Sequence, residues 1–145
     1  MFIAPTHCPS CNTLLILSKT KTDLICPNLD CPEQILKRLS YFCGRNIANI
    51  MGLSGEKLRI LTTKFTVSNV ADLYDLDYNL ITSFDNFGKL SVSNLQNSIE
   101  KSRQISVEKF LAGLGIDGIG VENAKLICQI IMENIENVSF EVLIE

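Results

Sequence analysis

Four cysteines near the N-terminus constrain the fold of this chain more than any other feature. Two residues separate Cys8 from Cys11, and four residues separate Cys26 from Cys31. Four thiolates in two such pairs can surround Zn²⁺ as a tetrahedron and leave no coordination position open for a substrate. We therefore expect one structural zinc ion, which would also stabilise a segment too short to fold on hydrophobic burial alone.

The residues between the two cysteine pairs predict a strand, a turn and a return strand. Residues 14–17 are apolar, residues 18–22 are polar, and residues 23–25 lead back to the second pair. The alternative to zinc is a pair of disulfides. Paired cysteines without a secretory leader in front of them favour a metal, because disulfides belong mainly to oxidising compartments.

Three other residues could in principle be metal ligands by residue type: His7, Cys43 and Cys128. His7 adjoins the first pair, but four thiolates already complete the site, so we expect His7 to be a bystander. Cys43 and Cys128 have no partner at metal-ligand spacing, and each is expected to be a small buried apolar residue.

Composition limits the partners of the chain. The 145 residues are 46% hydrophobic, which is typical of a globular domain with a small appendage, and no apolar run is long enough to span a membrane. The formal net charge of −3 argues against a large basic groove for nucleic acid. Any phosphate binding must therefore come from local basic clusters or from backbone N–H groups.

After the cysteines, the pattern becomes helical and repeats. Three segments, residues 52–58, 86–92 and 118–124, each carry a Gly or Asn, an apolar residue, a Gly or Ser, three more residues and a second apolar residue. A spacing of 34 and then 32 residues indicates repeated supersecondary units. We predict a mainly α fold, with a small four-cysteine zinc finger over residues 1–34 followed by tandem helix-hairpin-helix repeats over residues 35–145.

The repeated unit has a physical explanation. The incoming helix is expected to end at the first Gly or Asn, which adopts positive φ easily. The next apolar residue turns inward, and the small residue after it begins the outgoing helix with unobstructed N–H groups, which bind phosphate. One copy alone would be an ordinary helix connection, whereas three copies favour binding to a DNA backbone without reading the bases. The residues expected to contact DNA are Gly52, Ser54, Gly55, Lys57, Gly88, Lys89, Gly118, Gly120 and Lys125.

Apolar spacing and capping residues predict the helices around these copies. A helix over residues 33–51 should break near Gly44, and Asp77 and Ser106 should cap the helices that follow them. The remaining helices are expected over residues 70–76, 88–103, 107–114 and 121–135, with another beginning at 139.

Together these motifs resemble the zinc-finger and helix-hairpin-helix segment of bacterial NAD-dependent DNA ligases, over almost the whole chain. The specific marks are PTHCPSC at 5–11, CPNxxCP at 26–32, FxxRxxAxIxGL at 42–53, ADLY at 71–74, FGKxSxxNL at 87–95 and LGIxxIG at 114–120. The chain departs from the family pattern at Tyr41, where His is usual, at Cys43, where a small aliphatic residue is common, and at Asn86, which replaces a hairpin glycine.

The resemblance implies a function and a set of partners. It implies that Cys8, Cys11, Cys26 and Cys31 hold one zinc ion and that the hairpins contact the DNA backbone in the minor groove near a nick. The partners would be nicked double-stranded DNA and the remaining ligase domains, in the bacterial cytoplasm at the nucleoid and not at a membrane. The whole enzyme would seal nicks in replication and repair by adenylyl transfer.

The catalytic part of the ligase has no counterpart in these residues. The family's nucleophile lies in Lys-x-Asp-Gly, and the Asp117-Gly118 pair of this chain has Gly115 where the lysine would stand. We therefore expect no catalysis and no NAD binding by this chain, which looks like a piece of a ligase that stops before a fourth hairpin. Independent catalysis would need a nucleophile or an open metal site, and the sequence indicates neither.

A second function remains open from the sequence. The hairpins could pack against other protein domains as a scaffold or interdomain connector and never touch DNA. The acidic charge favours this alternative, and the repeated free helix N-termini oppose it. We also expect the apolar face of the third copy to be exposed or covered by self-association, given a mean hydropathy of +0.21. Its candidate residues are Leu126, Ile127, Ile130 and Ile131.

Overall fold

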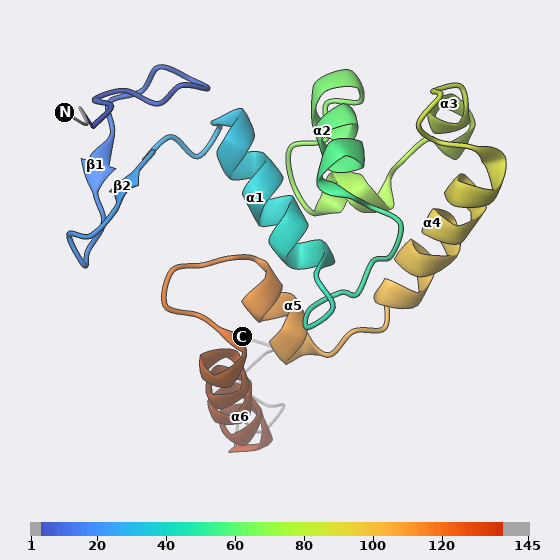
Figure 1. The fold of residues 1–145 in the computed structure, drawn as a ribbon. Coiled ribbons are helices and arrows are strands. Elements are labelled where there is room, and N and C mark those ends of the chain that lie inside the picture. The colour runs from blue at the N-terminus through green and yellow to red at the C-terminus, as the bar shows by residue number, and fades with distance from the viewer. Residues whose placement is uncertain (1–3, 138–145) are drawn as a thin grey trace, which may run out of the picture.

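The structure, a computed structural model, describes residues 4–137 as a small two-stranded sheet followed by an array of helices (Figure 1). The mainly α fold with an N-terminal cysteine cluster is thus confirmed. In order, the elements are β1 (Ile16–Leu17), β2 (Leu24–Ile25), α1 (Pro32–Cys43), α2 (Gly55–Lys64), the 3-10 helix η1 (Ala71–Tyr74), α3 (Tyr78–Thr82), α4 (Lys89–Ser102), α5 (Val107–Gly113) and α6 (Val121–Asn137). The helix expected from residue 139 lies outside the described residues.

The N-terminal sheet is smaller than the sequence predicts. β1 and β2 pair antiparallel, with Ile16 opposite Ile25 and Leu17 opposite Leu24, and all four side chains are exposed. Strand, turn and return strand are therefore confirmed in order, but each strand has only two residues. Because the sheet buries no apolar face, it cannot hold itself together by hydrophobic packing.

The helix boundaries follow from local chemistry. α1 begins with Pro32, whose missing N–H costs nothing in the first turn, and it ends before Gly44, where the sequence predicts a break. The Asp77 side chain accepts hydrogen bonds from two backbone N–H groups at the start of α3, and the Ser106 side chain accepts one from the Lys109 N–H at the start of α5. Both caps are confirmed.

One apolar core joins the helices from α1 to α6. Phe42 of α1 lies at its centre, with edge-to-face contacts to Tyr74 at 6.4 Å and to Phe110 at 6.3 Å between ring centroids. α5 packs so closely that a Cβ on Gly113 would lie 2.6 Å from Cγ2 of Ile47. Glycine fits there without displacing that side chain, so α5 packs closely beside the loop that follows α1. Within the part of the chain that the structure describes, no helix is long and apolar enough to cross a bilayer.

The incoming helices end earlier than expected. The repeat pattern predicts ends at residues 52, 86 and 118, but α1, α3 and α5 end several residues before those positions. The apolar spacing, which predicts a break near Gly44 and a helix over residues 107–114, comes closer for α1 and α5. After α1 the chain folds back on the helix end, where the N–H of Ala48 donates to the carbonyl of Phe42 and the N–H of Ile50 donates to that of Cys43. These tertiary loops have no signature in the repeat, which is why the repeat pattern alone places the helix ends too late.

The expected positive φ is present at two of the three hairpins. Gly52 has φ of 91° and Gly118 has φ of 83°, whereas Asn86 keeps an ordinary negative φ. The expectation is therefore wrong for Asn86, whose side-chain amide instead donates to the Glu56 carboxylate at 3.3 Å, near the start of α2. The second hairpin thus turns by a different backbone route.

The apolar face predicted for the third copy lies on α6. Leu126, Ile130 and Ile131 are exposed, as is the neighbouring Met132, while Ile127 is half-buried. Self-association through this face stays a prediction.

Candidate metal centre and nucleic-acid interface

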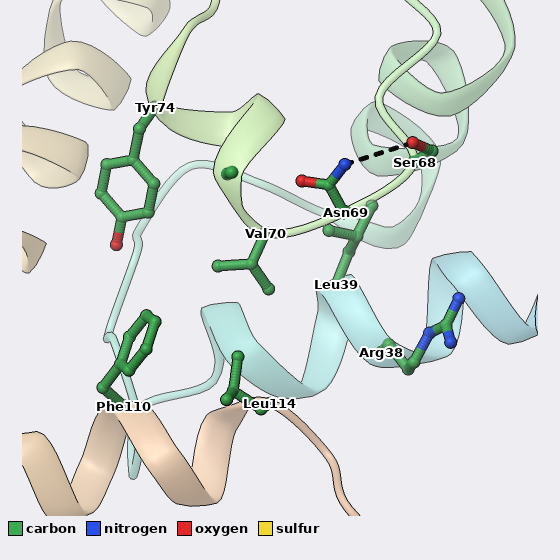
Figure 2. A pocket seen from close by; sticks show the side chains of 9 residues that line it. Arg38, Leu39, Ser68, Asn69, Val70, Tyr74, Phe110 and Leu114 are labelled. Atoms are coloured by element: carbon green, nitrogen blue, oxygen red, sulfur yellow. Dashed lines mark hydrogen bonds between the residues drawn. The ribbon is translucent and has the colours of Figure 1, made fainter.

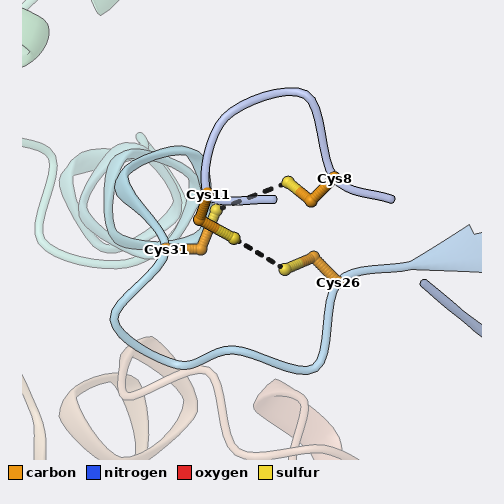
Figure 3. A group of neighbouring side chains, drawn as sticks. All are labelled: Cys8, Cys11, Cys26 and Cys31. Atoms are coloured by element: carbon orange, nitrogen blue, oxygen red, sulfur yellow. Dashed lines mark hydrogen bonds between the residues drawn. The ribbon is translucent and has the colours of Figure 1, made fainter. Parts of the chain in front are cut away.

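The four N-terminal cysteines come together as one cluster (Figure 3). Their Sγ atoms all lie within 4.8 Å of one another, with 3.8 Å between Cys8 and Cys31 and 3.4 Å between Cys11 and Cys26. Zinc–thiolate bonds of about 2.3 Å in a tetrahedron place neighbouring sulfurs about 3.8 Å apart. The cluster therefore fits zinc in both ligand chemistry and spacing.

Each cysteine pair is held by its own backbone turn. In the first turn, the Cys8 N–H donates to the Thr13 carbonyl at 2.8 Å, and Asn12 adopts φ of 57° to close the loop. In the second, the Cys31 N–H donates to the Asn28 carbonyl at 3.2 Å. Cys31 also precedes α1 and accepts its first helical hydrogen bond, so one ligand of the cluster is fixed to the start of a helix.

The thiols have unequal proton affinities. The side chain and backbone of Thr13 lower the pKa of Cys11 to about 6, whereas partial burial raises the pKa of Cys26 to about 12. A bound Zn²⁺ would hold both as thiolates, because ligation displaces the thiol proton. Burial also raises the pKa of Cys43 to about 12, and that side chain lies in the helical core, as expected for a structural cysteine. The His7 ring is hydrogen-bonded to the Thr6 hydroxyl at 3.0 Å and does not belong to the cysteine cluster.

The outgoing helices of the three hairpins begin alike. In each, the N–H of the seventh residue of the copy donates to the carbonyl of the third residue, at 2.9–3.0 Å. The seventh residue is buried, and the second residue is buried or packed against the core, as the sequence predicts. These donor–acceptor pairs are Leu58–Ser54, Val92–Gly88 and Ala124–Gly120.

The helix starts differ in how their first N–H groups are satisfied. The Ser54 hydroxyl accepts from the Lys57 N–H at 3.3 Å, so α2 is capped by a side chain. Gly88 precedes α4 with no side-chain cap. A Cβ on Gly88 or Gly120 would meet no atom within 4 Å. Packing inside the protein therefore does not require glycine at either position.

The predicted basic contacts are distributed unevenly. Lys57 turns toward the second hairpin, where its Nζ donates to Ser91 at 2.7 Å and lies 5.1 Å from the Phe87 ring centroid. Lys125 pairs with Glu122 at 3.1 Å, one turn back on α6. Lys89 is exposed at the start of α4. Lys89 therefore places its charge beside the uncapped start of α4.

A groove of about 730 Å³ adjoins the first hairpin, between the loop of residues 47–52, α4 and the start of α5. Lys101 and Lys109 line it together with three asparagine side chains, and it has no carboxylate among its lining residues. The sequence gives no signal for this grouping of lysines, because the groove joins segments far apart in the chain.

A second cavity, of about 530 Å³, lies between α1, η1 and α5 (Figure 2). Its lining is mainly aliphatic and aromatic, with Tyr74 and Phe110 on one side and Arg38 at the other end. None of its lining residues is a cysteine, histidine or carboxylate, so it offers neither a metal site nor an acid–base pair.

Comparison with known proteins gives the family of the cysteine cluster. The family described as "NAD-dependent DNA ligase C4 zinc finger domain" matches residues 7–32, which contain all four clustered cysteines. The resemblance to NAD-dependent DNA ligases is confirmed. Together with the sulfur geometry, the match assigns a structural zinc ion to this chain.

The similarity to proteins named DNA ligase covers nearly the whole chain and not only the zinc finger. The protein of Mesoplasma florum is 39% identical over 141 residues, which are 94% of this chain and 21% of that ligase. The Oenococcus oeni ligase is 36% identical over 97% of this chain, and the Lactobacillus johnsonii ligase is 40% identical over 93%, again about a fifth of each relative. The chain therefore spans about a fifth of the length of these ligases.

Two departures from the ligase pattern lie away from the zinc. Tyr41 is exposed on α1, and Cys43 is buried in the helical core. Neither side chain belongs to the cysteine cluster.

Proposed function

We propose that this chain binds duplex DNA at a nick without reading its sequence, as a non-catalytic part of an NAD-dependent DNA ligase. In this proposal residues 1–34 form the zinc module and residues 35–145 the hairpin region, and the other ligase domains and nicked DNA are the partners in the bacterial cytoplasm. The observation that carries the proposal is a helix start repeated three times, with an exposed glycine at Gly88 and Gly120 that internal packing does not require.

Main-chain donors suit this task in an acidic chain. The first N–H groups of a helix point outward and carry partial positive charge, so they bind phosphate oxygens without a charged side chain. Glycine lets a DNA backbone approach these groups closely. Lys89 at the start of α4, and Lys101 and Lys109 in the neighbouring groove, would add local positive charge. The zinc ion folds the module and has no open position for chemistry.

One observation favours a connector as the second candidate. α6 exposes several large apolar side chains along its length, including Leu126 and Met132. Such a face commonly packs against protein. DNA binding remains the better proposal, because an apolar face on α6 does not explain the uncapped start of α4 at Gly88.

Gly88→Thr separates the two candidates. Threonine and glycine serve about equally well as helix N-caps, so the helix should keep its stability. The hydroxyl of the new side chain would accept a hydrogen bond from an N–H group at the start of α4. It would also block a DNA phosphate from reaching that group. We expect affinity for a nicked duplex to fall roughly fivefold to thirtyfold, as for the loss of one or two phosphate contacts, while the thermal midpoint changes little.

Ser106→Thr is the matched control, since Ser106 caps α5 outside the three hairpins. Affinity should be unchanged in that variant. Equal affinity of wild type and Gly88→Thr for the duplex would show that α4 does not contact DNA and would favour the connector.

A further inference from the structure

The turn of the zinc module reaches the loop that precedes the third hairpin helix. Lys19, between β1 and β2, forms an ion pair and hydrogen bond with Asp117, between α5 and α6. The two residues are 98 positions apart in the sequence, and the ribbon shows the β1–β2 turn and the α5–α6 loop on the same side of α1 (Figure 1). This contact joins the zinc module directly to the third hairpin.

Arg38 makes a second bridge between the same two parts. Its guanidinium donates to the Leu29 carbonyl at 2.6 Å, within the second cysteine turn. Its Cγ lies 3.9 Å from the position of a Cβ on Gly115, at the start of the α5–α6 loop. A single α1 side chain therefore contacts the second cysteine turn, and the hairpin loop passes close to its stem at Gly115.

The α5–α6 loop is held by a few hydrogen bonds of its own: the Ile119 N–H donates to the Ile116 carbonyl at 2.9 Å, and the Asn123 side-chain amide donates to the Gly118 carbonyl at 2.7 Å. Its residues 114–118 are exposed, and Gly115 and Gly118 both have positive φ, at 69° and 83°. Glycines at such positions allow several backbone routes, so contacts from outside the loop select one of them. The ion pair from the Lys19 ammonium, which lowers the pKa of Asp117, is a contact of this kind, and the stem of Arg38 lies close to Gly115.

We propose that Lys19 and Arg38 are positioning residues, which hold the α5–α6 loop against the zinc module so that the metal site sets the geometry of the third hairpin. Zinc binding then orders the β1–β2 turn and the Leu29 carbonyl, and these order the loop that leads into α6. The effect on DNA affinity rests on the function proposed above. The ordering of the loop does not, and it is measured without DNA.

The test is amide hydrogen exchange of residues 114–120 in the zinc-loaded protein at low salt. Lys19→Glu should speed exchange there by up to about fivefold, the usual limit for one exposed ion pair. Lys19→Glu combined with Asp117→Lys should restore the slow exchange, because it reverses the pair and keeps the attraction. The acceleration in Lys19→Glu should shrink in 1 M salt, where charges are screened within about 3 Å.

Lys21→Glu is the matched control, in the same turn but with no ion pair to Asp117. It should leave the loop unchanged. Removing zinc from the wild type should speed exchange in residues 114–120 as well as in the module. Equal exchange in Lys19→Glu and Lys21→Glu, or failure of the double variant to restore the wild-type rate, would overturn the proposal. If the wild type does not bind DNA but the variants and the zinc-free protein show these exchange changes, only the proposed function is contradicted.

Discussion

Replacing Cys26 with Ser unfolds the N-terminal module and leaves the helical region folded. Within residues 4–31 the only buried side chains are Cys8 and Cys31, so the segment has no apolar core to replace the metal. Structural zinc sites in finger peptides contribute about 10–16 kcal/mol on binding, far more than a sheet with two residues in each strand can supply. Metal analysis should give one zinc per wild-type chain and almost none in Cys26→Ser.

Amide exchange locates the damage. In Cys26→Ser, or in the wild type after chelation, residues 4–31 should lose protection while α2 and α4 keep theirs. Cys128→Ser is the control, because Cys128 lies on α6 outside the cluster and should keep both zinc and protection. A Cys26→Ser protein that retains a protected module without metal would show that zinc has no structural role.

Phe87→Ala is expected to lower the free energy of unfolding by about 3–5 kcal/mol, the usual cost of removing a buried phenylalanine side chain. Phe87 is 0% exposed and anchors the second hairpin in the shared core. It also supports Lys57, whose ammonium lies over its ring and reaches Ser91. The cavity left behind would therefore loosen the junction between α2 and α4.

Urea unfolding followed by circular dichroism measures this loss. Leu90→Ala is the matched control, since Leu90 lies three residues away and is 75% exposed. Its free energy of unfolding should change by no more than about 0.5 kcal/mol. Similar losses in the two variants would mean that Phe87 does not anchor the hairpin.

Local chemistry made the zinc site and most helix starts predictable. The cysteine spacing requires only that two short turns face each other, and Asp77 and Ser106 act within one helical turn of their own positions. The apolar second and seventh residues of each hairpin copy were predictable for a related reason. A helix connection that packs on itself needs apolar side chains at those positions.

Long-range contacts were not predictable from local patterns. The lysine at 57 suggested a free phosphate partner, but the fold places Ser91 and Phe87 within its reach. Asn86 suggested a backbone turn, but its side chain finds Glu56 on another helix. The same is true of Arg38, whose guanidinium reaches the Leu29 carbonyl only once the second cysteine turn lies beside α1.

Binding of the zinc-loaded chain to nicked duplexes over a salt series tests DNA binding most directly. Two duplexes of unrelated sequence should bind with equal affinity, because phosphates and not bases are contacted. The logarithm of the binding constant should fall linearly with the logarithm of salt concentration, with a slope of about −0.9 for each phosphate neutralised by a lysine. Because most of the proposed donors are neutral main-chain N–H groups, the slope should be shallow and should correspond to only a few phosphates neutralised by lysines. Absence of binding at about 50 mM salt, or a strong preference for one sequence, would contradict DNA-backbone recognition by these hairpins.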